Sequence, residues 1–91
     1  MVIEKSASAG TLESSDCMVS IKPADTLEIK VESVVLQQFG DQIRAVAARM
    51  LEKLGITQAA VEIFDRGALD CVIEARVETA IKRATKKGDA Q

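Results

Sequence analysis

Two stretches of the chain alternate between apolar and more polar positions. Every second residue in them is apolar: Cys17, Val19 and Ile21 in CMVSIK, and Leu27, Ile29 and Val31 in LEIKVE. A period of two with β-branched residues predicts two strands that each bury one face. Between them, residues 23–26 (PADT) have the composition of a turn. We therefore expect the two strands to form an antiparallel hairpin.

The period changes to that of a helix from about Val34. Apolar residues then recur at steps of three and four: Phe39, Ile43, Val46 or Ala47, Met50 and Leu54. This spacing places them on one helical stripe. Ser33 suits the N-cap, and Gly55 suits a left-handed residue just past the helix end. Gly40 is expected to mark a close packing contact, because glycine inside a helix costs about 1 kcal/mol relative to alanine.

A third strand and a second helix follow. Residues 59–65 (AAVEIFD) predict a strand with Val61 and Ile63 on one face and Phe64 on the other. After Gly67 the helical spacing returns in Leu69, Val72 or Ile73, Val77, Ala80, Ile81 and Ala84. Asp70 in the first turn suits the helix dipole, as do the basic residues expected in the last turn, Lys82, Arg83, Lys86 and Lys87. Gly88 is the expected end of this helix.

These elements predict one α+β domain. The order β-β-α-β-α indicates a two-layer sandwich, in which a three-stranded sheet carries both helices on one face. Residues 17–88 form this domain, residues 1–16 are expected to be a flexible N-terminal segment, and residues 89–91 a frayed C-terminus. The strand order stays open. If the strands on either side of the first helix are parallel neighbours, that helix is a crossover connection.

The composition argues against an autonomous enzyme. The 91 residues contain no His, which excludes a Ser-His-Asp triad and a zinc site that needs imidazole. No spacing of carboxylates indicates another metal site. The net charge of −2 and the lack of Trp and Tyr argue against nucleic-acid binding.

The two cysteines and the start of the chain bear on the compartment. The N-terminal residues lack the apolar core of a signal peptide, and no stretch is long and apolar enough to cross a membrane. We therefore expect a cytoplasmic protein. Cys17 and Cys71 have no CxxC spacing and are expected to be free thiols rather than a disulfide.

Residues 9–16 (AGTLESSD) lie outside the periodic elements, directly before the first predicted strand. A serine hydroxyl in such a segment is exposed on a pliable backbone, as an enzyme that modifies it requires. An ordinary polar approach to a strand has the same composition. The residues by themselves leave both interpretations open.

Three separate motifs, however, resemble one family. GTLESSD (10–16), QFGDQIR (38–44) and GALDC (67–71), the last followed by EARVE, resemble the citrate lyase acyl carrier protein, the gamma subunit of that complex. The likeness runs from about Ala9 to Val77 in the family's order. It implies a carrier in citrate fermentation rather than a catalyst.

The resemblance also implies a modified residue and its partners. A serine in the family's GTLES motif is esterified to 2'-(5''-phosphoribosyl)-3'-dephospho-coenzyme A, whose thiol carries acetyl that is exchanged for citryl. The matching residue here is Ser14. An alpha subunit transfers the acyl group, a beta subunit cleaves the citryl thioester to oxaloacetate, and a prosthetic-group transferase performs the attachment. Some family members have Gly after the modified serine, so Ser15 in this chain stays open as a competing hydroxyl.

Other interpretations remain beside this one. The acyl carrier of malonate decarboxylase uses the same kind of serine-linked group. A plain protein-interaction module would carry no group at all, and a small hydrolase acting through Ser14 would lack a base. If a phosphorylated arm is attached at Ser14, the flanking Glu13 and Asp16 are expected to repel it from the carrier surface. Recognition of these carboxylates by the transferase is an equally open interpretation.

Overall fold

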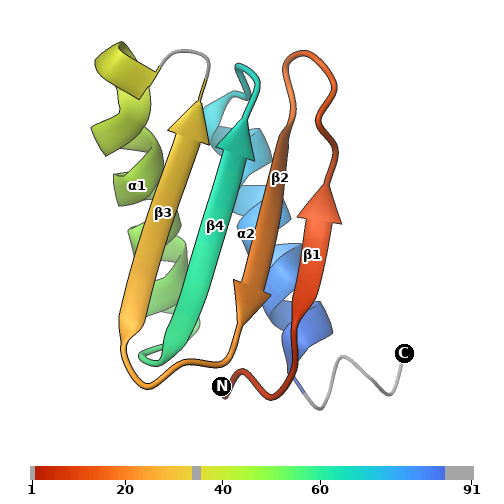
Figure 1. The fold of residues 1–91 in the computed structure, drawn as a ribbon, viewed down its shortest axis with the longest axis vertical. Coiled ribbons are helices and arrows are strands. Elements are labelled where there is room, and N and C mark those ends of the chain that lie inside the picture. The colour runs from red at the N-terminus through yellow and green to blue at the C-terminus, as the bar shows by residue number, and fades with distance from the viewer. Residues whose placement is uncertain (1, 34–35, 86–91) are drawn as a thin grey trace.

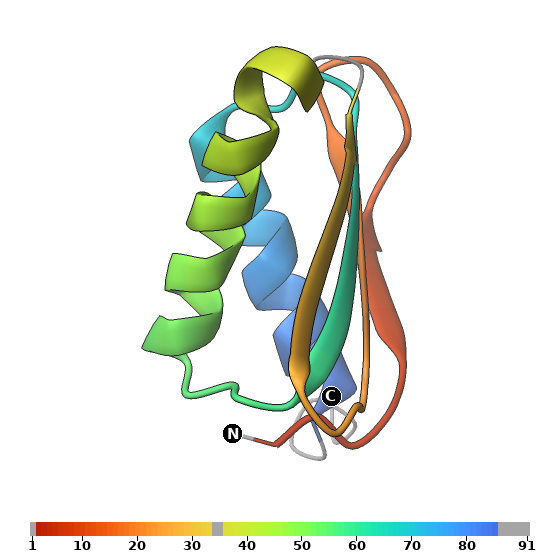
Figure 2. The same ribbon diagram turned by 60° about the vertical axis from the view of Figure 1, so that its left-hand side comes forward.

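The structure is a computed structural model that describes residues 2–33 and 36–85, with the backbone alone for residues 36–39. The elements in chain order are β1 (Ala7–Gly10), β2 (Cys17–Lys22), β3 (Leu27–Ser33), α1 (Leu36–Lys53), β4 (Ala59–Asp65) and α2 (Asp70–Ala84). They form one mixed sheet with the strand order β1-β2-β4-β3 (Figure 1). Both helices cover the same face of this sheet (Figure 2). The expected α+β class with two helices on one face is therefore confirmed.

The expected hairpin between β2 and β3 is wrong, because β4 lies between them. β4 pairs antiparallel with β2 and parallel with β3, so that Ile63 stands opposite both Val19 and Val31. The helix α1 is thus the crossover between parallel neighbours. Alternation along a strand fixes which side chains share a face, but it does not fix which strand is the neighbour.

The linker of residues 23–26 passes across the start of β4 instead of closing a hairpin. The Ala59 N–H donates to the Thr26 carbonyl at 3.1 Å, and the Gln58 side chain donates to the Asp25 carbonyl at 3.3 Å. Crossing two strand spacings requires about 9.5 Å. Four extended residues reach about 13 Å, so this short linker is long enough for either topology.

The N-terminal segment, expected to be a flexible arm, supplies a fourth strand that its sequence pattern does not predict. Residues Ala7–Gly10 pair antiparallel with β2, which makes the sheet four-stranded rather than three-stranded. Ile3 and Ala9 are buried in the core. The N–H groups of Glu4 and Lys5 donate to the Ala84 carbonyl at 2.9 and 3.1 Å. The folded domain therefore includes residues before Cys17.

The core lies between the sheet and the helices. Its largest fully buried side chains include Ile21, Leu51, Ile63, Ile73 and Ile81. The predicted stripes are confirmed at Ile43, Val46 and Ala47 in α1 and at Ile73, Val77, Ala80, Ile81 and Ala84 in α2. Leu69 is an exception: it is 70% exposed, because it precedes α2 at the N-cap position.

The helix ends differ partly from the expectation. Gly55 has φ 74 and is left-handed as predicted. Ser33 is the last residue of β3 and not the N-cap of α1, which begins at Leu36. α2 ends at Ala84, with Thr85 extended, so its end comes before Gly88. The predictions for the Phe39 side chain, Val34, Lys86, Lys87, Gly88 and residues 89–91 lie outside what the structure describes.

Within the described residues neither helix is long and apolar enough to span a bilayer.

Candidate functional site

Ser14 lies at the tip of the loop that joins β1 to β2. The Asp16 N–H donates to the Glu13 carbonyl at 3.2 Å, which closes a β-turn over residues 13–16. Ser14 and Ser15 occupy its two central positions, and both are exposed. Ser15 has φ 65, the left-handed conformation that the second central residue of a type II turn adopts and that glycine favours. The turn therefore presents the Ser14 hydroxyl to solvent.

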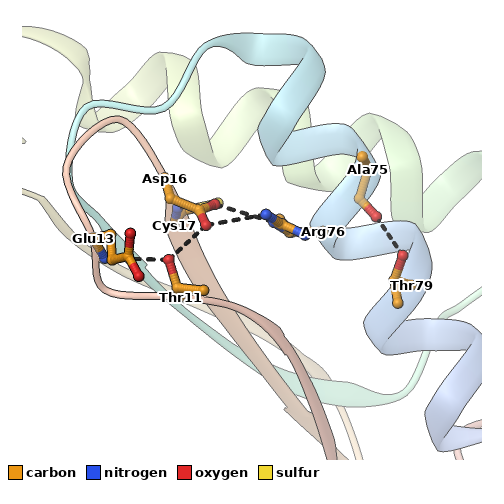
Figure 3. Close-up of polar contacts among 7 residues, drawn as sticks. All are labelled: Thr11, Glu13, Asp16, Cys17, Ala75, Arg76 and Thr79. Atoms are coloured by element: carbon orange, nitrogen blue, oxygen red, sulfur yellow. Dashed lines mark hydrogen bonds and ion pairs between the residues drawn. The ribbon is translucent and has the colours of Figure 1, made fainter.

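The Asp16 side chain organises this loop from inside (Figure 3). It accepts hydrogen bonds from the Thr11 hydroxyl at 2.6 Å and from the Cys17 N–H at 2.7 Å. The Arg76 guanidinium, on α2, binds both carboxylate oxygens at 3.1 and 3.0 Å. The Asp16 side chain is only 14% exposed. A carboxylate next to the two serines is thus turned inward and paired with a cation.

The protonation states follow from these contacts. Hydrogen bonds from Arg76, Thr11 and the Cys17 amide hold the pKa of the Asp16 carboxyl well below its usual range. The same pairing raises the pKa of Arg76. Burial raises the pKa of the Cys17 thiol to about 11, and the carboxylates of Asp16 and Asp65 add to this shift. At neutral pH the pair is therefore ionised and the Cys17 thiol is protonated.

A second loop, between β4 and α2, is joined to the first. The Ser15 N–H donates to the Arg66 carbonyl at 2.8 Å, and the Arg66 N–H donates to the Asp16 carbonyl at 2.9 Å. The buried Asp65 carboxylate shapes this second loop by accepting from the N–H groups of Gly67 at 3.1 Å and Ala68 at 2.9 Å. It also accepts from the Ser33 hydroxyl at 2.8 Å. One end of the sheet therefore carries two loops, each built around an aspartate.

Gly10 allows the Ser14 loop to close. Its φ is 100, and a Cβ placed there would overlap the Cys17 carbonyl oxygen. That Cβ would also lie 3.2 Å from Cδ of Arg76. The Thr11 N–H donates to the same Cys17 carbonyl at 3.2 Å. A residue without a side chain is thus required where β1 ends and the Arg76 side chain passes.

The Ser14 hydroxyl is exposed, and the structure describes no side chain that activates it. Among the described residues no side chain hydrogen-bonds the Ser14 hydroxyl. The Asp16 carboxylate, two residues away, is turned inward and is already paired with Arg76. No group of three potential metal ligands occurs in the described part of the chain. Cys17 is buried and Cys71 is exposed, and both are free thiols. This arrangement suits a hydroxyl that another protein modifies.

Sequence reasoning located the two serines but missed Arg76 and the bond between the two loops. The sequence places the negative charge of Asp16 close to Ser14, and the structure shows this charge compensated by Arg76. The two partners are 60 positions apart in the chain. No local pattern signals such a pair, because it depends on α2 lying next to the β1–β2 loop.

The chain is similar to known proteins over nearly its whole length. A family model described as "ACP: Malonate decarboxylase delta subunit (MdcD)" matches residues 4–84. The citrate lyase acyl carrier protein of Haemophilus influenzae strain PittEE is 56% identical, over 93% of this chain and 90% of its own length. The protein of the same name from Clostridium perfringens strain 13 is 52% identical, over 94% and 87%.

A solved structure shares the fold. It is a chain of a Pseudomonas malonate decarboxylase hetero-tetramer in complex with malonate, and it matches with a TM-score of 0.80 over 91% of this chain and 87% of that one. The identity is 21%, so this likeness concerns the fold alone. By the family model and by relatives that are more than half identical, the chain belongs to the acyl carrier family that includes the malonate decarboxylase delta subunit and the citrate lyase acyl carrier proteins.

Proposed function

We propose that this chain is the acyl carrier subunit of citrate lyase and that Ser14 is its attachment residue. The observation that carries the proposal is the exposed Ser14 hydroxyl on a hydrogen-bonded turn, in a chain more than half identical to citrate lyase acyl carrier proteins. The turn presents this hydroxyl on a hydrogen-bonded backbone, and no described side chain forms a hydrogen bond with it.

The geometry favours Ser14 over Ser15. Ser15 occupies the left-handed position of the turn, with φ 65, where a glycine is equally or better accommodated. This gives a physical reason for the Gly that follows the modified serine in some members of the family. The residue that must carry a hydroxyl is therefore the preceding one. Ser15 instead contributes its backbone N–H, which donates to the Arg66 carbonyl.

The residues present fit a covalently attached 2'-(5''-phosphoribosyl)-3'-dephospho-coenzyme A. Ser14 is exposed, and its neighbours Leu12, Glu13 and Ser15 are exposed as well. These residues therefore leave room for an attached arm to extend into solvent. Asp16 is paired with Arg76, which leaves Glu13 as the uncompensated carboxylate next to Ser14 in the loop. The group, when bound, supplies the thiol that carries acetyl and citryl.

This chain anchors the prosthetic group and presents its acyl group, and other chains perform the acyl transfer and the cleavage. The described residues provide no base for the Ser14 hydroxyl, and the Cys17 thiol is buried with its pKa raised to about 11, so it does not compete as an acyl acceptor. Tethering raises the effective concentration of the acyl group at each partner's active site. The partners we propose are the alpha and beta subunits of citrate lyase and the transferase that attaches the group.

An intact-mass experiment tests the attachment. The chain is produced together with the prosthetic-group transferase, as wild type and as the Ser14→Ala and Ser15→Ala variants. Wild type and Ser15→Ala are expected to show one discrete mass increase, localised by peptide mapping to residue 14, and Ser14→Ala is expected to show none. An adduct that persists in Ser14→Ala and disappears in Ser15→Ala would move the site to Ser15. An unmodified wild type would favour a plain interaction module.

A second experiment separates citrate lyase from malonate decarboxylase, which the description of the family model also suggests. The modified chain, with the thiol of its group acetylated beforehand, is combined with citrate lyase alpha and beta subunits, and oxaloacetate release from citrate is measured. In parallel it is combined with the remaining malonate decarboxylase subunits and malonate. We expect activity in the first mixture. Activity confined to the second would assign the chain to malonate decarboxylase.

A further inference from the structure

We propose that Asp16 and Arg76 are positioning residues, which hold the Ser14 turn in the conformation that the attaching enzyme accepts. This inference rests on the proposed function, because it concerns the presentation of Ser14. It adds a role for α2: one of its side chains controls a loop that α2 does not itself contain.

Asp16 makes most of the side-chain hydrogen bonds that order this loop. Glu13, Ser14 and Ser15 are exposed and Leu12 is 49% exposed, so the tip buries little apolar surface that would fix it. What remains is hydrogen bonding. The backbone of Ser15 and Asp16 is bonded to that of Arg66. The Asp16 side chain accepts four further bonds, one from Thr11, one from the Cys17 N–H and two from Arg76. With little apolar packing, such a segment opens at low free-energy cost once its polar contacts are removed.

Arg76 connects this loop to a rigid part of the domain. Two of its neighbours on α2, Val77 directly after it and Ile73 one turn before it, are completely buried. The guanidinium meets the carboxylate with two nitrogens, at 3.1 and 3.0 Å, and a planar two-point contact fixes direction as well as distance. Gly10 leaves the space beside Cδ of Arg76 that this contact needs. The turn is therefore oriented relative to α2 and not only relative to its own strands.

A positioning role has a kinetic consequence for the attachment reaction. The Ser14 hydroxyl must reach the reacting atom of the donor within the transferase, and small errors in placement lower the rate by up to about a hundredfold. Removing the pair frees the turn before binding, so a part of the binding free energy is used to order it again. The rate of attachment then falls although Ser14 and its exposure are unchanged.

The test compares Arg76→Gln, Arg76→Lys and Asp16→Asn with a control on the same helix. Lys82→Gln breaks the exposed ion pair between Lys82 and Glu78, whose atoms are 3.2 Å apart and which does not touch the loop. Two quantities are measured: amide hydrogen exchange in peptides covering residues 11–16, and kcat/KM for the mass increase caused by the transferase. Exchange in peptides of α1 and β4 reports whether the core stays intact.

For Arg76→Gln and Asp16→Asn we expect exchange in residues 11–16 to accelerate at least about tenfold while α1 and β4 exchange as in wild type. The kcat/KM for attachment is expected to fall about tenfold or more. Arg76→Lys keeps the charge but not the two-point contact. Its exchange rate in residues 11–16 and its kcat/KM for attachment are expected to lie between those of Arg76→Gln and wild type. Lys82→Gln is expected to match wild type in both measurements.

Two results would overturn the inference. One is an unchanged attachment rate in Arg76→Gln and Asp16→Asn. The other is a slower rate with unchanged exchange in residues 11–16, which would make Arg76 a direct contact of the transferase. Both are distinct from failure of the proposed function, which would appear as a wild-type chain that accepts no group.

Discussion

Replacing Gly10 with alanine tests how the Ser14 loop is closed, and Gly67 offers a matched control. Both glycines have positive φ, 100 at Gly10 and 94 at Gly67. A Cβ at Gly10 would overlap the Cys17 carbonyl oxygen and lie 3.0 Å from the Cys17 carbonyl carbon, whereas a Cβ at Gly67 meets nothing within 4 Å. The two variants therefore share the backbone strain and differ in the steric overlap.

The expected loss of stability follows from these two contributions. A non-glycine residue in such a conformation costs about 1–3 kcal/mol, and this applies to both variants. Forcing a methyl group against the backbone of β2 adds about 1–3 kcal/mol in Gly10→Ala. In a domain of this size 1 kcal/mol lowers Tm by about 4–8 °C, so Gly10→Ala is expected to melt at least about 4 °C below Gly67→Ala.

The assay is thermal and urea unfolding of the two variants and wild type, followed by circular dichroism in one buffer. Both glycine variants are expected to unfold below wild type, with Gly10→Ala the less stable. If Gly10→Ala were as stable as Gly67→Ala, the close approach of Gly10 to the Cys17 carbonyl would not exist as described. The argument that this loop needs glycine for space would then be wrong.

Four further predictions concern individual side chains. Ser15→Gly is expected to raise the free energy of unfolding by roughly 0.5–1 kcal/mol in urea titrations, because relief of the left-handed strain exceeds the added freedom of the unfolded chain. Asp65→Ala removes the acceptor of three hydrogen bonds and is expected to cost about 2–4 kcal/mol in the same assay; a loss below 0.5 kcal/mol would contradict this. Cys71 is expected to react with a thiol reagent at pH 8 and Cys17 only after unfolding. The pKa of the Cys17 thiol is raised to about 11 in the folded chain. Between pH 9 and 11 this thiol therefore ionises mainly in the unfolded chain, and the free energy of unfolding is expected to fall as pH rises through this window.

The predicted elements and their faces were largely confirmed. The strands at residues 17–22 and 59–65 have the predicted bounds, and most of the predicted stripe positions of both helices are buried, with Leu69 the exposed exception. These features depend on the spacing of apolar residues within one segment, which is set by the geometry of a strand or a helix. The edge strand β1 was missed, because four short residues, ASAG, give too little alternation to be recognised.

The amino-acid sequence by itself determined the α+β class, the two helices, three of the strands and the position of the candidate serines. Each of these features depends on a pattern of residues that are close together in the chain. Only the tertiary structure decided that β4 separates β2 from β3 and that Arg76 neutralises Asp16. Both depend on which distant segments become neighbours when the core closes. A linker of four residues is compatible with either strand order, and a surface arginine looks the same in the sequence whether or not a carboxylate lies opposite. The physical reason is that local spacing fixes faces, whereas partners across the fold are selected by the joint packing of all elements.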